Sequence, residues 1–113
     1  MNKTASILLC SILMWLAPGS ATADPYVGYF SAEIDGRHYR VNIERVNSTT
    51  YDGILQIDNE HMQLDARRYG ELMTGRLANE TRQLGFDARI QGGILILDTA
   101  DGQRIIFRRG TEQ

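Results

Sequence analysis

The sequence predicts an all-β protein, a small eight-stranded antiparallel β-barrel of up-and-down topology, with a flattened β-sandwich as the alternative. Three observations predict this fold. After residue 25, apolar and polar residues alternate through short segments, turn sequences separate these segments, and glycines recur inside them. No segment of this region has a helical period. The short connections favour antiparallel neighbours over crossover connections.

One glycine motif recurs three times in this region. Apolar residues stand two positions before and two positions after Gly28, Gly53 and Gly75. Because side chains alternate along a strand, each glycine shares a face with its two apolar neighbours. A glycine there marks a bend or a close backbone approach, and repeated bends let a sheet coil and close. The motif therefore favours a barrel over a sandwich.

Residues 1–23 have the features of a secretory signal peptide. A positive start at Lys3 is followed by the apolar residues 7–17, then by Pro-Gly-Ser and by the small-x-small cleavage sequence at residues 21–23. An uncleaved membrane anchor is the alternative. The apolar run, however, is shorter than the roughly 20 residues that a spanning helix needs. The sequence thus predicts cleavage and export.

Cys10 is not expected to carry a lipid, because Leu9 rather than a small residue precedes it. The expected organisation is a signal peptide over residues 1–23 and a single β-barrel domain over residues 24–113. Cleavage would remove the only Cys of the chain, so no disulfide could stabilise the domain. Its stability would then come from a well-filled core and a closed hydrogen-bond ladder.

Each strand follows from its alternation and its flanking turns. Asp35-Gly36 is a strong hairpin signal after the first strand, and Gly92-Gly93 and Asp101-Gly102 separate the last three strands. Polar stretches at residues 47–50, 58–60 and 79–83, and Tyr69-Gly70, separate the others. The expected strands are residues 26–34, 37–46, 51–57, 61–67, 72–78, 84–91, 94–99 and 103–109.

The inner face of the barrel is expected to be almost entirely apolar. Eight strands enclose a space just wide enough to be filled by side chains or to hold one small ligand. Because most inward residues are large, we expect a filled core. The predicted inward residues are Phe30, Ala32, Ile34, Tyr39, Val41, Ile43, Tyr51, Leu55, Ile57, Met62, Leu64, Ala66, Met73, Leu77, Phe86, Ala88, Ile90, Leu95, Leu97, Ile105 and Phe107.

Charge limits the classes of partner. The chain of 113 residues has 12 Lys and Arg against 14 Asp and Glu, and losing Lys3 would leave 11 Arg and a net charge near −3. This mild balance gives no reason to expect nucleic acid. The short positive start suits a bacterial envelope, so a periplasmic or secreted location is expected. In a eukaryotic secretory route, Asn47 and Asn79 would head glycosylation sequences on loops.

Few residues of the domain suit catalysis. His38 and His61 stand at outward strand positions, and neither has a second ligand at the spacing of a metal site. Carboxylates such as Glu33, Asp52, Asp65 and Asp87 alternate outward and are typical of solvated surface, although pairs of them could meet across strands. No phosphate loop or dinucleotide motif is present. The sequence therefore predicts no enzymatic activity, no metal and no cofactor.

The outer face of the closing strands is unusually apolar. Residues 94–97 are apolar on both faces, and residues 105–107 repeat this pattern. Contiguous apolar surface flanked by arginine commonly marks a partner interface. Because the eighth strand of such a barrel pairs with the first, we expect one patch over strands one, seven and eight. The expected partner-contact residues are Val27, Tyr29, Ile94, Ile96 and Ile106, with Arg104 and Arg108 orienting charged groups.

Alternatives to this interface stay open. The residues before Tyr26 could cover the patch, or the apolar run could simply raise strand propensity. Self-association and binding of a foreign protein cannot be separated. A different function is that of a carrier, with a small apolar ligand in the barrel mouth lined by Phe30, Tyr39, Tyr51 and Phe86.

In outline, the hairpin count and size of the domain resemble the small exported barrels of the lipocalin and avidin kind, a calycin-like architecture that includes bacterial periplasmic inhibitors of metalloproteases. The resemblance covers the whole domain and is architectural. The domain lacks the Trp that is typical of lipocalins and avidins and the disulfide of those inhibitors. No functional residue is carried over, because fold does not imply function.

The sequence as a whole predicts an exported, non-enzymatic β-barrel binding protein. It would act by protein–protein interaction, as an inhibitor or immunity factor or as an accessory of envelope assembly. No stable membrane insertion is expected after signal cleavage.

Overall fold

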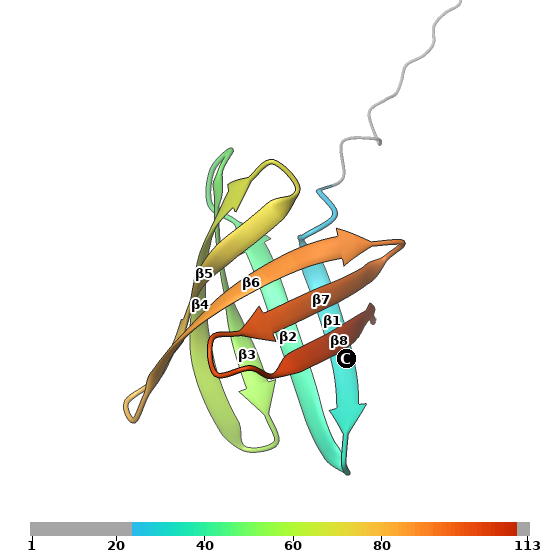
Figure 1. Cartoon of the computed structure of the whole chain (residues 1–113), viewed down its shortest axis with the longest axis vertical. Coiled ribbons are helices and arrows are strands. Elements are labelled where there is room, and N and C mark those ends of the chain that lie inside the picture. Colours follow the sequence, from blue (N-terminus) through green and yellow to red (C-terminus); the bar gives the residue numbers. More distant parts are fainter. Residues whose placement is uncertain (1–23, 111–113) are drawn as a thin grey trace, which may run out of the picture.

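The computed structural model describes residues 24–110, so the predicted signal peptide with Cys10 lies outside the described residues. Within this range eight strands form one closed antiparallel barrel, with each strand beside the next in sequence and β8 beside β1 (Figure 1). The predicted barrel is confirmed. The strands are β1 (Gly28–Ile34), β2 (Arg37–Arg45), β3 (Thr50–Ile57), β4 (Glu60–Tyr69), β5 (Leu72–Ala78), β6 (Gln83–Gln91), β7 (Ile94–Thr99) and β8 (Arg104–Arg109).

Two-residue turns set the register of several hairpins. Asp35 and Gly36 both have positive φ, 54° and 81°, and so do Gly92 and Gly93, 57° and 82°. Positive φ at both central positions is the turn geometry whose twist matches that of the flanking strands. The turn at Asp35 places Ile34 opposite Arg37 and sets the pairing of β1 with β2 along the whole of β1.

Two of the strand glycines are places where strands approach too closely for a side chain. A Cβ on Gly53 would collide with the carbonyl oxygen of Asn42 on β2, and a Cβ on Gly75 would collide with that of Asp65 on β4. Both glycines therefore let the sheet bend sharply, as the motif predicts. Gly28 differs, because its φ of 131° places it at the corner where the chain enters β1.

The barrel interior is filled by apolar side chains, as expected from the alternation. All predicted inward residues are buried except Ala32, Ile34 and Ile90, which are partly buried and pack against the core. Leu64, Met73, Leu95, Leu97 and Phe107 have no exposed surface. Apolar side chains thus fill the predicted inward positions.

Two strand ends differ from the expectation by two residues, and five others differ by one. β1 begins at Gly28 rather than residue 26, because Tyr26 and Val27 lie in a turn that crosses the end of the barrel. Tyr26 is 1% exposed and joins the core. β4 extends to Tyr69, which pairs with Leu72, so Gly70 and Glu71 form the turn instead of Tyr69-Gly70.

The loops at Asn47 and Asn79 contain the same kind of hydrogen-bonded turn. In each, the side-chain oxygen of the asparagine accepts hydrogen bonds from the backbone N–H and the hydroxyl of the threonine two positions later. It also accepts from the next backbone N–H, that of Thr50 or Arg82. Such turns explain the Asn-x-Thr pattern at these loops without any modification.

The barrel closes over a short stretch. The β1–β8 ladder comprises Phe30 opposite Arg109 and Ser31 opposite Arg108, continued by a hydrogen bond from Gly110 N–H to the carbonyl of Tyr29. By contrast, β2 pairs with all seven residues of β1. Figure 1 shows β6, β7 and β8 crossing in front of β1 and β2 at a steep angle. β8 therefore meets β1 mainly near the carboxyl end of β8.

Candidate functional site

The predicted contact residues of β7 and β8 lie side by side on the outer face of the barrel. The hairpin register places Ile96 directly opposite Ile106 and Ile94 opposite Arg108. All these positions alternate with core residues such as Leu95 and Phe107, so they lie on the outer face. Ile106 is 50% exposed, and Ile94 and Ile96 are partly exposed. We call Ile94, Ile96, Ile106, Arg104 and Arg108 the closing-strand patch.

An ion-pair cluster borders the patch. Arg104 donates two hydrogen bonds to Asp98, from Nε at 2.7 Å and from Nη2 at 3.2 Å, and Arg89 Nη1 lies 3.9 Å from the same carboxylate. The hydrogen bonds from Arg104 hold the pKa of Asp98 below its usual value. Arg108 has no ion pair with any residue in 24–110. The patch is therefore apolar at its centre and positive along its β8 side.

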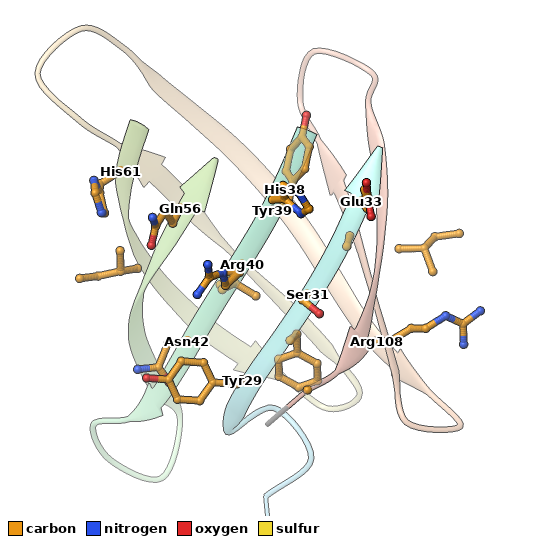
Figure 2. A pocket seen from close by; sticks show the side chains of 16 residues that line it. Tyr29, Ser31, Glu33, His38, Tyr39, Arg40, Asn42, Gln56, His61 and Arg108 are labelled. Carbon is orange, nitrogen blue, oxygen red and sulfur yellow. The ribbon is translucent and has the colours of Figure 1, made fainter. Parts of the chain in front are cut away.

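Of the two predicted contact residues from the start of the barrel, Val27 lies away from this patch. Val27 is partly buried and packs against the core, because the chain turns inward before β1. Tyr29 lies at the β1–β8 junction, where its carbonyl accepts a hydrogen bond from Gly110 N–H, and Figure 2 shows its ring extending from β1 toward Asn42 on β2. The structure thus brings together Ile94, Ile96 and Ile106 with their arginines, and it separates Val27 from them.

A groove crosses the outer face of β1, β2 and β3, with a volume of about 930 Å³ (Figure 2). The barrel register aligns its side chains in rows across the strands. Ser31 stands opposite Arg40, Arg40 opposite Gln56, and Gln56 opposite His61. We call this the outer groove, lined on its outer face by Tyr29, Ser31, Glu33, His38, Arg40, Asn42, Ile54, Gln56 and His61, with Ile106 and Arg108 at its border.

The outer groove is rich in hydrogen-bond donors and poor in acids. Arg40 is exposed at its centre and has no ion pair within residues 24–110, and Glu33 is its one acidic lining residue among those described. Nearby, Asp58 accepts hydrogen bonds from the backbone N–H of His38 at 3.1 Å and from Arg37 Nε at 3.0 Å. These two bonds lower the pKa of Asp58. Sequence alternation identified these outward residues, but the concave shape depends on how the sheet curves.

The opposite end of the barrel holds a buried polar cluster. The carboxylate of Asp24 accepts hydrogen bonds from the Tyr51 hydroxyl and from the backbone N–H of Tyr26, at 2.5 and 3.0 Å. Arg68 Nη1 lies 3.5 Å and Arg45 Nη1 lies 3.8 Å from this carboxylate, whose side chain is 7% exposed. We call these five residues the capped end.

Tyr26 closes this end. Its hydroxyl donates to the carbonyls of Glu71 and Ala88, at 2.8 and 3.3 Å, and its ring lies 5.9 Å from that of Tyr51. Burial raises the pKa of both tyrosines, and in Tyr51 the hydrogen bond to Asp24 adds to the rise. The Arg68 guanidinium stacks 5.2 Å from the Tyr26 ring. These contacts are structural, because they fill and neutralise the end of the barrel.

Arg109 fastens the same end from β8. It donates to the carbonyls of Val27 and Pro25, at 2.9 and 2.7 Å, and its guanidinium lies 4.5 Å from the Phe30 ring. The residues before β1 are thereby held across the barrel end by contacts to β3, β4 and β8. They do not cover the closing-strand patch within residues 24–110.

The four residues expected to line a ligand mouth do not share one cavity. Phe30 and Tyr39 border the outer groove, whereas Tyr51 belongs to the capped end and borders a separate shallow depression on β3–β5. Phe86 borders neither of these two hollows and is 3% exposed in the core.

Catalytic constellations are sparse on the described part of the chain. Asp52 stands opposite Asp65 and Asp87 opposite Asp98, so carboxylates do meet across strands, but they lie on the outer face without a histidine opposite them. Residues 24–110 contain no group of three or more His, Cys, Asp or Glu that could hold a metal ion. The same residues include no helix that could cross a membrane.

Comparison with protein-family models, with curated proteins and with solved structures found no match for this chain.

Proposed function

We propose that this chain is a non-enzymatic binding protein of the bacterial envelope or extracellular space that acts through protein–protein interaction. An inhibitor or immunity factor and an accessory of envelope assembly are the two roles that fit best. The observation that carries the proposal is the pair Ile96 and Ile106, adjacent on the outer face and bordered by arginines. Apolar side chains with an arginine rim are typical of interface centres.

Core packing favours this function over that of a ligand carrier. The inward positions hold buried side chains, and Tyr26 fills one end of the barrel. A carrier would need an internal space of roughly 300 Å³ or more. The binding surface is therefore sought on the outside of the barrel.

Export is part of the proposal, and one structural observation supports it. Asp24, the residue that would follow the predicted cleavage site, is already bound to Tyr51 and Arg68 in the capped end. A barrel that begins at Asp24 keeps these contacts. Signal-peptide cleavage would thus release a domain whose first residue is a structural one.

Affinity capture from the envelope fraction tests the proposed interface. We expect Ile106→Asp to abolish capture of the partner while the β-sheet circular dichroism signal and the thermal midpoint stay unchanged. Val46→Asp is the matched control, because Val46 is 57% exposed on the β2–β3 loop, away from the closing strands. Undiminished capture by the Ile106→Asp protein would refute the patch. Loss of capture in Ile54→Asp alone would move the interface to the outer groove.

A further inference from the structure

The junction between β1 and β8 leaves part of a strand edge without a partner strand. The β1–β8 ladder covers Phe30 to Ser31 on β1 and Arg108 to Arg109 on β8. β8 itself begins at Arg104 and pairs with β7 from Arg104 onward. Toward residue 104, therefore, one edge of β8 faces away from β7 with no paired strand among residues 24–110. We call residues 104–107 of β8 the open edge.

The hydrogen-bond pattern tells which backbone groups face outward along the open edge. In an antiparallel sheet, the backbone N–H and C=O of one residue both point to the same neighbouring strand. Those of the next residue both point to the strand on the other side. The carbonyl of Gln103 accepts from Thr99 N–H on the β7 side, so Ile105 and Phe107 also face β7. Gly110 N–H donates to Tyr29 on β1, so Arg108, Ile106 and Arg104 face the β1 side. From Arg108 toward Arg104 the β1–β8 ladder does not continue. The outward-facing backbone N–H and C=O groups of Ile106 and Arg104 are therefore available to another strand.

The side chains beside this edge define what could pair with it. Arg104, Ile106 and Arg108 alternate with core residues and project from the outer face of β8. An added strand would place its own outward side chains opposite Arg104 and Ile106, since directly opposite residues on antiparallel strands lie about 5 Å apart. Arg108 stands opposite Ser31 of β1 and would flank the end of the added strand. An acid opposite Arg104, an apolar residue opposite Ile106 and a further acid toward Arg108 form the complementary pattern. Glu33, on β1, is the acidic side chain that borders the same junction.

A second copy of this chain fits the edge poorly. Antiparallel pairing of two β8 strands about Ile106 would need the edge beside Arg108, which Ser31 of β1 already occupies, and would bring Arg104 of each copy close to Arg108 of the other. Like charges close together destabilise strand pairing. A partner segment that supplies carboxylates avoids this repulsion and offers an acceptor to Arg108, which has no ion pair within residues 24–110.

We propose that the partner docks by strand addition: an extended acidic segment of another protein, with an apolar residue between acids, hydrogen-bonds to the backbone of Ile106 and Arg104. This inference rests on the proposed function and specifies its binding mode. Main-chain hydrogen bonds give such complexes their affinity, and side chains at alternate positions give them specificity. The exposed Ile106 then serves both as a side-chain contact and as a backbone partner.

Hydrogen exchange of individual amides tests the free edge and the bound edge in the wild-type chain. In the free protein, the Ile106 amide should exchange fast, while those of Ile105 and Phe107 are protected by β7. The probe is a synthetic eight-residue peptide of alternating Glu and Val. Its binding should slow exchange at Ile106 by about tenfold or more, and the same peptide with alternate amides N-methylated should not. An Ile106 amide already protected in the free chain would overturn the proposal, as would peptide binding without added protection or no binding at millimolar peptide.

Two substitutions separate backbone from side-chain recognition. Ile106→Pro removes the N–H that faces the edge and leaves the bonds of Ile105 to β7, and Pro is tolerated at edge positions. It should weaken peptide binding by about tenfold, the value of one backbone hydrogen bond, whereas Ile106→Val should bind as wild type. A peptide with Lys in place of Glu should bind more weakly, and equal binding would overturn the acidic specificity.

Failure of the strand-addition mode and failure of the proposed function give different results. If the partner uses the closing-strand patch without adding a strand, capture from the envelope is lost in Ile106→Asp, and the Ile106 amide of the wild-type chain exchanges as fast in the complex as in the free protein. If the patch is not an interface at all, capture is kept in Ile106→Asp.

Discussion

Two aspartates of this barrel each lie between two arginines, and they differ in almost everything else. Asp24 at the capped end has Arg68 at 3.5 Å and Arg45 at 3.8 Å, with its side chain 7% exposed. Asp98 beside the closing-strand patch has Arg104 at 2.7 Å and Arg89 at 3.9 Å, with its side chain 34% exposed. The buried carboxylate also accepts a hydroxyl and a backbone N–H.

The difference separates a buried cluster that holds the fold together from an exposed cluster whose arginines can still contact a partner. The groups around Asp24 come from the residues before β1 and from the ends of β2, β3 and β4, so the cluster ties distant parts of the chain together. The cluster around Asp98 joins neighbouring strands only, and water screens it. Arg104 uses two of its five N–H donors on Asp98, so the rest remain for a partner. One aspartate between two arginines thus stabilises the capped end, and the other leaves arginine donors exposed beside the closing-strand patch.

Removing the Tyr26 side chain should disrupt the capped end and cause the largest loss in the free energy of unfolding. Tyr26→Ala would delete a buried ring and two hydrogen bonds to the carbonyls of Glu71 and Ala88. We expect a loss of about 3 to 4 kcal/mol in the free energy of unfolding, measured by urea denaturation. Tyr26→Phe keeps the ring and should cost about 1 kcal/mol. Similar stability of the alanine variant and the wild type would show that the barrel end does not need this residue.

Matched substitutions of the two aspartates should sharpen the comparison. Asp24→Ala leaves the Tyr51 hydroxyl and the Tyr26 N–H without their acceptor in a buried site, so it should cost about 2 kcal/mol of unfolding free energy. Asp98→Ala removes an exposed ion pair and should lower stability far less, with an effect that shrinks further in high salt. Equal losses from both substitutions would contradict the distinction between the two clusters.

Opposite pH responses are the smallest expected effects. The raised pKa of Tyr26 and Tyr51 means that the fold favours the neutral phenols. Their contribution is therefore complete below the ordinary tyrosine pKa of about 10 and is lost as pH rises through the raised values. Stability should thus fall above pH ~10, and Tyr51→Phe should reduce that fall.

Asp98 should respond at the acid end of the range. Its pKa is lowered by Arg104, so its contribution is present above the ordinary aspartate pKa of about 3.9 and disappears as pH falls through the lowered value. Thermal midpoints measured between pH 5 and pH 2 should show a slightly shallower decline in Asp98→Asn than in wild type. A steeper decline in the variant would contradict the assignment.

Sequence reasoning succeeded where local rules decide the outcome. The alternation identified the inward residues, and hairpin turns such as Gly92-Gly93 fixed the neighbours of each strand. The adjacency of Ile96 and Ile106 follows from the short loop that joins β7 to β8. The predicted residues of β7 and β8 are therefore adjacent, and their role as an interface stays a prediction.

Reasoning from the sequence failed where distant segments meet. Alternation extended the first strand back to residue 26, but the chain turns there, buries Tyr26 in the barrel end and packs Val27 against the core. No local pattern shows that Asp24 would meet Arg68 across 44 residues. The outer groove escaped prediction for a related reason, since its outward residues come from several strands and the hollow between them depends on how the sheet coils.

The sequence alone determined the strand count, the inner and outer faces and the apolar character of the closing strands, because period-2 alternation and turn chemistry act over a few residues. Only the tertiary structure decided how far β8 pairs with β1, which backbone groups remain at the open edge and which aspartate is buried. These features depend on the coiling of the whole sheet and on contacts between the two ends of the domain, and no short stretch of sequence encodes them.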